Sequence, residues 1–145
     1  MSIAVRTIAR LLLAPSLVVA VAIMVKGYSD VGDGFSAGVI VALAVSLQYV
    51  ASGARRAEAE LPLLRRAPLV AGAGLLLALA VGFFPVLTGK PIFTHWPPPG
   101  AHPITIGTLE VLTAVVFDIG VFLLVVGVLV ILVLQLAADE PPAAP

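Results

Sequence analysis

Two carboxylates, Glu110 and Asp118, stand inside the longest apolar segment of the chain, which runs from about residue 104 to residue 136. In a single helix, eight residues would separate the two side chains by about 12 Å along the axis and about 80° around it. They would then share one broad side, with Asp118 near the middle of a bilayer and Glu110 near its outer surface. An aspartate at the centre costs roughly 2.5–3.5 kcal/mol, so Asp118 should lie against protein or water.

The sequence leaves three interpretations of Asp118 open. It is a protonatable or cation-accessible site on an ion route, a buried acceptor that fixes helix packing, or a carboxylate nearer the membrane surface than a helix from residue 104 would place it. No lysine, arginine or histidine of this chain is expected at its depth. For Glu110 the simpler interpretation is a side chain that reaches headgroup water from the end of the helix.

A second polar segment, "KGYSDVGDGFSAG", separates two apolar runs at residues 26–38. Gly27 and Gly32 can supply the unusual backbone angles of a tight turn between two helices. Asp30 and Asp33 come just ahead of the next apolar run, where they would cap a helix and meet the positive end of its dipole. Attraction of a cation to these aspartates is the weaker alternative. The segment is therefore predicted to be a helix-entry turn.

Small residues recur where helices would have to approach each other. Gly34 and Gly38 form a small-xxx-small pair, and Gly120 and Gly127 lie seven residues apart on nearly one face of the last helix. Such faces are typical of membrane helices that pack closely. A chain with several of them is expected to pack inside a larger assembly.

The composition indicates lipid as the solvent of this chain. Of 145 residues, 61% are hydrophobic and 11% charged, whereas soluble domains carry about 25% charged residues. Eight basic and eight acidic residues balance, so no nucleic-acid partner is expected. The chain has no cysteine, and the spacing of His95 and His102 matches no metal site. Phosphate-loop, dinucleotide and hydrolase motifs are also missing, so we expect neither an enzyme nor a cofactor.

Four segments meet or approach the roughly 17–25 residues needed to cross a hydrocarbon core of about 30 Å. We expect spans at about residues 3–25, 34–52, 67–87 and 104–136. The predicted fold class is an all-α integral membrane protein, with four transmembrane helices in an up-and-down bundle over residues 1–138. A signal peptide cleaved near Ala22 is the alternative for the first span, but its apolar run continues to Val25, which favours a retained helix.

The arginines predict the orientation. Two precede the first span and four lie between the second and third, namely Arg6, Arg10, Arg55, Arg56, Arg65 and Arg66. The other two loops hold one lysine each, so the positive-inside rule places both termini in the cytoplasm. The acidic, proline-rich residues 139–145 are expected to be a disordered tail. Residues 52–67 are predicted to be a solvated connector, with an amphipathic turn along the headgroups as the alternative.

Two motifs resemble those of a known family. "GYSDVGDGFSAG" is similar to the G-H-x-x-P-G-G-G-F-x-A-G signature of the MnhB domain, which forms one component of multi-subunit Mrp-type Na+/H+ antiporters. "FDIGVFLLVVG" resembles the closing helix of that family, with Phe117, Asp118 and Gly120 on its F-D-x-G motif. Residues that keep their places in the first signature are Gly27, Gly32, Gly34, Phe35, Ala37 and Gly38. Tyr28 stands where the family commonly has histidine, so the resemblance supports a backbone role for this motif.

The resemblance implies a non-catalytic subunit of a multi-subunit complex in a bacterial or archaeal cell membrane. Its partners would be the other antiporter subunits and the lipid bilayer, with Na+ and H+ as the transported ions. This chain would contribute to assembly and to the cation path, with Asp118 as its leading functional residue. A structural adaptor in a hydrogenase- or respiratory-type complex, which shares such modules, is the alternative; an autonomous small exporter is a third possibility.

Overall fold

The computed structural model describes residues 3–26, 33–98, 100, 102, 104–106, 109–111 and 113–138. Four of its helical segments are long and apolar enough to cross a membrane, which confirms the predicted fold class. The main helices are α1 (Ile3–Lys26), α2 (Asp33–Ser52), α4 (Ala67–Phe83) and α5 (Thr113–Ala138). A 3-10 helix, η2 (Phe84–Thr88), continues α4 from the turn that contains Pro85.

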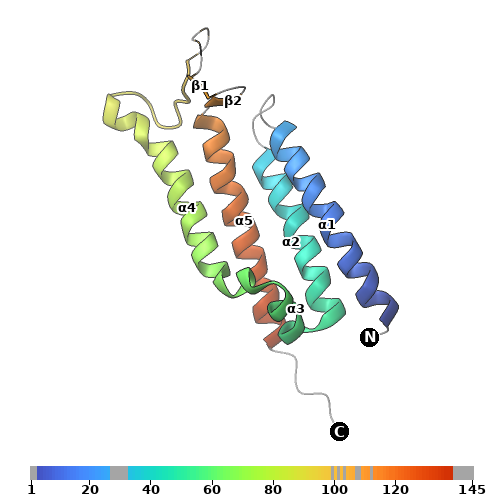
Figure 1. Cartoon of the computed structure of the whole chain (residues 1–145). Helices are drawn as coiled ribbons and strands as arrows, with labels where there is room; N and C mark the ends of the chain where they lie inside the picture. Colours follow the sequence, from blue (N-terminus) through green and yellow to red (C-terminus); the bar gives the residue numbers. More distant parts are fainter. Residues whose placement is uncertain are drawn as a thin grey trace.

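The helices run alternately up and down, and Figure 1 shows the start of α1 and the end of α5 at the same end of the molecule. We call this the arginine end, because the arginine-rich segment between α2 and α4 also lies there. We call the opposite end, which carries two short strands, the hairpin end.

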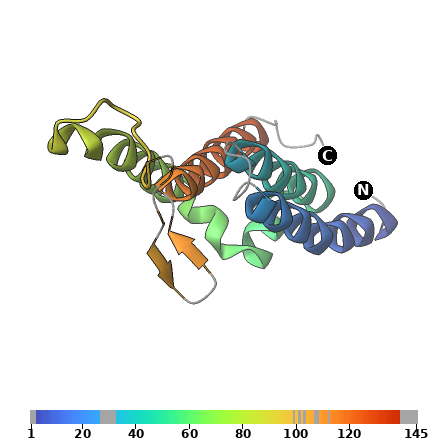
Figure 2. The same cartoon turned by 90° about the horizontal axis from the view of Figure 1, so that it is seen from above.

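The four helices lie side by side in the order α1, α2, α5, α4. Figure 2, which looks down on them, shows α1 and α4 at opposite edges of this row. The two central helices therefore each have two helical neighbours, whereas each edge helix packs mainly against one. As a result, α1 is poorly covered, with 11% of its most apolar window buried, compared with 56% for α2.

The interior of the row consists mainly of small side chains. Alanine dominates the buried hydrophobic residues, and the shared core centres on α2, with Ala37, Val41 and Val45 packed against Ala20 of α1 and Val130 of α5. Close contact between backbones replaces the interlocking of large side chains, as is usual where lipid tails are as apolar as leucine. Many of the large apolar residues consequently point away from the row.

The last helix begins later than predicted. Residues Ile104–Ile106 and Leu109–Val111 form an antiparallel pair of strands, β1 and β2, and α5 starts only at Thr113. Apolarity alone could not distinguish these residues from helix. Their β-branched side chains, Ile104, Thr105, Ile106 and Val111, favour strand. The predicted span of 104–136 is therefore wrong at its start.

The segment between α2 and α4 is folded rather than a simple solvated connector. It forms a short helix, α3 (Ala54–Glu60), followed by the 3-10 helix η1 (Pro62–Arg66). Ala57 and Leu64 are buried in the core cluster, while all four arginines of the segment are exposed. The amphipathic alternative is thus the better description: an apolar side closes the arginine end of the row.

Candidate functional site

The F-D-x-G motif lies in the first two turns of α5, close to the hairpin end. Because α5 starts at Thr113, Asp118 is only about 7.5 Å along the axis from the first residue of the helix. The membrane-spanning part of α5 extends from Thr113 to Leu136, so Asp118 lies well away from its centre. The mid-bilayer position predicted from a helix starting near residue 104 is therefore wrong, and the interpretation nearer the surface is favoured.

Asp118 faces α2. The residue is buried, with 8% of its surface exposed, and its backbone carbonyl touches α2 at Gly34 so closely that a Cβ at position 34 would overlap it. One turn further along α2, a Cβ at Gly38 would lie 2.9 Å from Cβ of Val125 and 3.2 Å from the carbonyl oxygen of Phe122. The two glycines thus form the contact surface between α2 and α5, and Asp118 stands at its hairpin end.

Gly120 faces the opposite neighbour, α4. A Cβ at position 120 would lie 2.8 Å from the backbone nitrogen of Ala78 and 3.0 Å from the carbonyl oxygen of Gly74. Seven residues further on, a Cβ at Gly127 would lie 2.7 Å from Cβ of Ala71. Gly120 and Gly127 therefore mark one line of backbone contact along α4, as expected from their spacing.

Phe117 points toward the loop that follows η2. Its ring packs edge-on against Phe93, with centroids 5.8 Å apart, and lies 6.3 Å from the ring of His95. Phe93 adopts a left-handed backbone conformation, φ 58°, which is uncommon for a bulky residue. Its amide donates a hydrogen bond to the carbonyl of Gly82 at 2.9 Å, and its ring covers Gly82. The loop is thereby anchored to both α4 and α5.

Thr113 strengthens this anchor at the first residue of α5. Its amide donates to the Trp96 carbonyl at 3.1 Å, and its hydroxyl oxygen accepts a hydrogen bond from the Trp96 amide at 2.7 Å. Three neighbouring motif residues thus serve three different elements: Phe117 the loop, Asp118 helix α2, and Gly120 helix α4.

The first motif is only partly described. Asp33 is the first residue of α2 and half-buried, so its carboxylate lies in the first turn, where the helix dipole favours negative charge. Phe35 is 59% exposed and points away from the other helices. Gly27, Asp30 and Gly32 lie outside the described residues, as does the predicted tail, residues 139–145.

Glu110 is not on the helix that carries Asp118. It lies on β2, opposite Thr105 of β1. The expectation that the two carboxylates share one side of a helix is therefore wrong, because that expectation required helix through residues 104–112. Within the described part of the chain, no three histidine, aspartate or glutamate side chains come together as a metal site.

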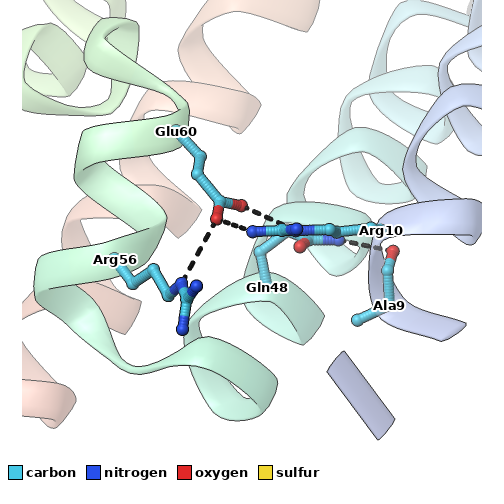
Figure 3. Close-up of polar contacts among 5 residues, drawn as sticks. All are labelled: Ala9, Arg10, Gln48, Arg56 and Glu60. Atoms are coloured by element: carbon cyan, nitrogen blue, oxygen red, sulfur yellow. Dashed lines mark hydrogen bonds and ion pairs between the residues drawn. The ribbon is translucent and has the colours of Figure 1, made fainter. Parts of the chain in front are cut away.

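A second polar cluster lies at the arginine end. Figure 3 shows Arg10 of α1 and Arg56 of α3 both directed at the Glu60 carboxylate. Arg10 makes two contacts with that carboxylate, one of them from Nε at 3.1 Å, and Arg56 Nε lies 3.5 Å away. Beside this cluster, the buried Gln48 of α2 donates a hydrogen bond to the carbonyl of Ala9 in α1. These contacts tie α1 to both α2 and α3.

The hydrogen bond from Arg10 lowers the pKa of Glu60, and the positive charges of Arg10 and Arg56 act in the same direction. Sequence reasoning did not identify this cluster. The Arg56–Glu60 pair was detectable from its i,i+4 spacing, but only if residues 54–60 are recognised as helix. The Arg10–Glu60 pair spans 50 residues of sequence, and no local signal predicts it.

Comparison with known proteins gives a consistent result. Residues 4–131 match a domain related to the MnhB subunit of Na+/H+ antiporter. The corresponding Na+/H+ antiporter component of Bacillus subtilis, its B subunit, is 33% identical over 118 residues, which cover 81% of this chain and 80% of the relative. The B subunit of the Alkalihalophilus pseudofirmus Na+/H+ antiporter is 32% identical over 114 residues, covering 79% and 77%. The combined A/B subunit of a probable K+/H+ antiporter of Rhizobium meliloti is 34% identical over 116 residues, which cover 79% of this chain but 11% of that relative.

Proposed function

Because this chain belongs to the MnhB domain family of Na+/H+ antiporter subunits, we propose that it is a non-catalytic subunit of a multi-subunit cation/proton antiporter. It is a multi-pass membrane protein with four spanning helices. We place it in the cell membrane of its organism with the arginine end in the cytoplasm, following the positive-inside rule. Its contribution is to hold neighbouring subunits together and to border the path of the transported ions.

The observation that carries the assembly role is the incomplete cover of the two edge helices. Along α1, large apolar residues such as Leu11 and Val18 are more than 60% exposed, and α4 exposes Leu69 and Leu76 to about 70%. A row of four helices leaves these faces for lipid or for other hydrophobic subunits. Relatives named as subunits of antiporters support the second occupant for at least part of this surface.

Asp118 is the residue of this chain that we propose for the ion path. Among the described residues of the four spans, it is the one acidic side chain other than Asp33, the first residue of α2. Carboxylates inside membrane helices mark ion and proton routes because their burial is otherwise unfavourable. Its place at the contact between α2 and α5, near a membrane surface, suits entry to or exit from such a route.

Removal of the gene tests whether the chain is part of an antiporter. Everted membrane vesicles from cells that lack the chain should lose cation-dependent dissipation of an imposed pH gradient, and expression of the chain in trans should restore it. Na+ and K+ assayed separately would identify the cation. Full exchange in vesicles without the chain would overturn the proposal, and purification of the chain with hydrogenase subunits would favour the adaptor alternative.

Asp118→Asn tests the ion-path role. Asparagine keeps the size and one acceptor oxygen but cannot carry the charge, so the variant should still assemble while exchange falls by at least about tenfold. Asp118→Glu, which retains the charge, should keep part of the activity. If Asp118→Asn assembled and exchanged ions normally over the whole pH range, Asp118 would be a packing residue only.

A further inference from the structure

A pocket of about 310 Å³ opens at the arginine end between α1 and α3. Three arginines line it, Arg6 and Arg10 from α1 and Arg56 from α3, together with Ile3 and Thr7. From this arrangement we propose that the pocket binds the phosphate of an anionic phospholipid in the leaflet at the arginine end. The inference is independent of the antiport proposal.

The charge of the pocket favours a phosphate ligand. Its three arginines contribute three positive charges, and the adjacent Glu60 contributes one negative charge, which leaves two positive charges. Glu60 holds Arg10 and Arg56 in place, since both guanidinium groups contact its carboxylate (Figure 3). Arg6 forms no ion pair with the described residues and is half-buried. Guanidinium groups match phosphate oxygens in planar, bidentate geometry, so a phosphate is the natural further partner.

The surface next to the pocket favours a lipid over a free anion. On the face of α1 that carries Arg10, the next residues are Ala14, Leu17 and Val21, all within about 40° of Arg10 around the helix axis. All three are exposed, Leu17 to 42% and Val21 to 62%. Arg10 to Val21 is about 16 Å along the helix, which is about half of a hydrocarbon core of 30 Å. A positively charged pocket at the foot of an apolar stripe of one leaflet's depth matches the shape and chemistry of a phospholipid.

Two single substitutions test the site without breaking the α1–α3 contact. Arg6→Gln removes a pocket charge that has no described ion pair. Arg55→Gln removes the same charge from the exposed neighbour of Arg56, which does not line the pocket. The purified full-length chain in mild detergent is titrated with dioleoyl phosphatidylglycerol or dioleoyl phosphatidylcholine, and bound lipids are counted by native mass spectrometry.

We expect the wild-type chain to bind the first phosphatidylglycerol more tightly than phosphatidylcholine. Arg6→Gln should weaken phosphatidylglycerol binding about fivefold, the effect of one arginine near an anionic headgroup, whereas Arg55→Gln should leave it nearly unchanged. Equal effects of the two variants, or equal binding of both lipids, would overturn the proposal. Displacement of the lipid by excess inorganic phosphate would assign the pocket to a free anion. Loss of co-purifying subunits on Arg6→Gln with unchanged lipid binding would assign it to an acidic segment of a partner.

Discussion

Gly72 and Gly74 lie two residues apart in α4 but differ in what surrounds them. A Cβ at Gly72 meets nothing within 4 Å, whereas a Cβ at Gly74 would clash with backbone atoms of α5 at Gly120 and Leu124. Gly74→Ala should therefore force α4 and α5 apart and destabilise the chain by about 1–3 kcal/mol. Gly72→Ala is the matched control and should be neutral or slightly stabilising, because alanine is the better helix former. Thermal unfolding of both purified variants measures the difference; equal midpoints would contradict the close packing of α4 against α5.

Tyr49 offers a second test at the residue scale. Its side chain is buried in the core, and its hydroxyl has no hydrogen-bond partner among the described residues. Since an unsatisfied buried hydroxyl is unfavourable, Tyr49→Phe should leave stability unchanged or raise it by about 1 kcal/mol. Tyr49→Leu, which also removes the ring, should lower stability by about 2–4 kcal/mol through the cavity it leaves. A clear loss of stability in Tyr49→Phe would mean that the hydroxyl has a partner in the membrane.

The two carboxylates of the last apolar segment show how far residue types alone could lead. Asp118 was identified because an acid in an apolar segment is unusual whatever the exact helix boundary. Its depth and its relation to Glu110 were not predictable, since both depend on where the helix starts. The i,i+3 and i,i+4 periodicity of a uniformly apolar segment carries no such boundary. The contacts of Gly120 with α4 and of Gly34 with α2 likewise depend on which helices are neighbours.

At the scale of elements, Glu60 connects α3 to α1 through Arg10. The Arg10 hydrogen bond lowers the pKa of Glu60, so the stabilisation is fully present above the ordinary pKa of a glutamate. It is lost as the pH falls through the lowered pKa, because protonation removes the charge that Arg10 contacts. The thermal midpoint of the wild-type chain should therefore drop on acidification, and Glu60→Gln should have a lower midpoint at neutral pH with a smaller acid-dependent drop.

Glu58→Gln is the control for this prediction. Glu58 also lies on α3, but its ion pair is with Arg65 of η1 at 3.5 Å, within the same folded segment. Its removal leaves the contact with α1 intact. If Glu58→Gln reduced the acid-dependent drop as much as Glu60→Gln, the pH effect would belong to the general charge of the segment and not to the α1–α3 contact.

Elements differed in how well the sequence specified them. The spans of α1, α2 and α4 followed from long apolar runs with polar flanks, and such runs have few alternative structures in a membrane. The β1–β2 hairpin did not, because "ITI" and "LEV" are apolar enough to read as a continuation of the helix. The fold of α3 and η1 depends on burial of Ala57 and Leu64 beneath the row, a tertiary contact that local sequence does not show.

At the scale of the whole molecule, the sequence predicted four helices but not their order. Short loops bring sequential helices close, which favours the pairs α1–α2 and α4–α5. The contact between α2 and α5 joins those pairs and is made by Gly34 and Gly38, one of the small-xxx-small pairs. Such a pair predicts close approach but does not name the partner helix. The open row follows from this pairing and leaves both edges free for other contacts.

Orientation can be measured directly because the chain has no cysteine. Arg65 lies exposed on η1 at the arginine end, and Lys90 lies exposed in the loop after η2 near the hairpin end. Each is replaced singly, as Arg65→Cys and Lys90→Cys, and intact cells are treated with a membrane-impermeant maleimide. With six arginines at one end, the positive-inside rule predicts label on Lys90→Cys in intact cells and on Arg65→Cys only after the membrane is opened. Because each change also removes a positive charge, Thr94→Cys, which removes none, should be labelled like Lys90→Cys. Labelling of Arg65→Cys in intact cells would reverse the orientation and would move the proposed phospholipid site to the outer leaflet.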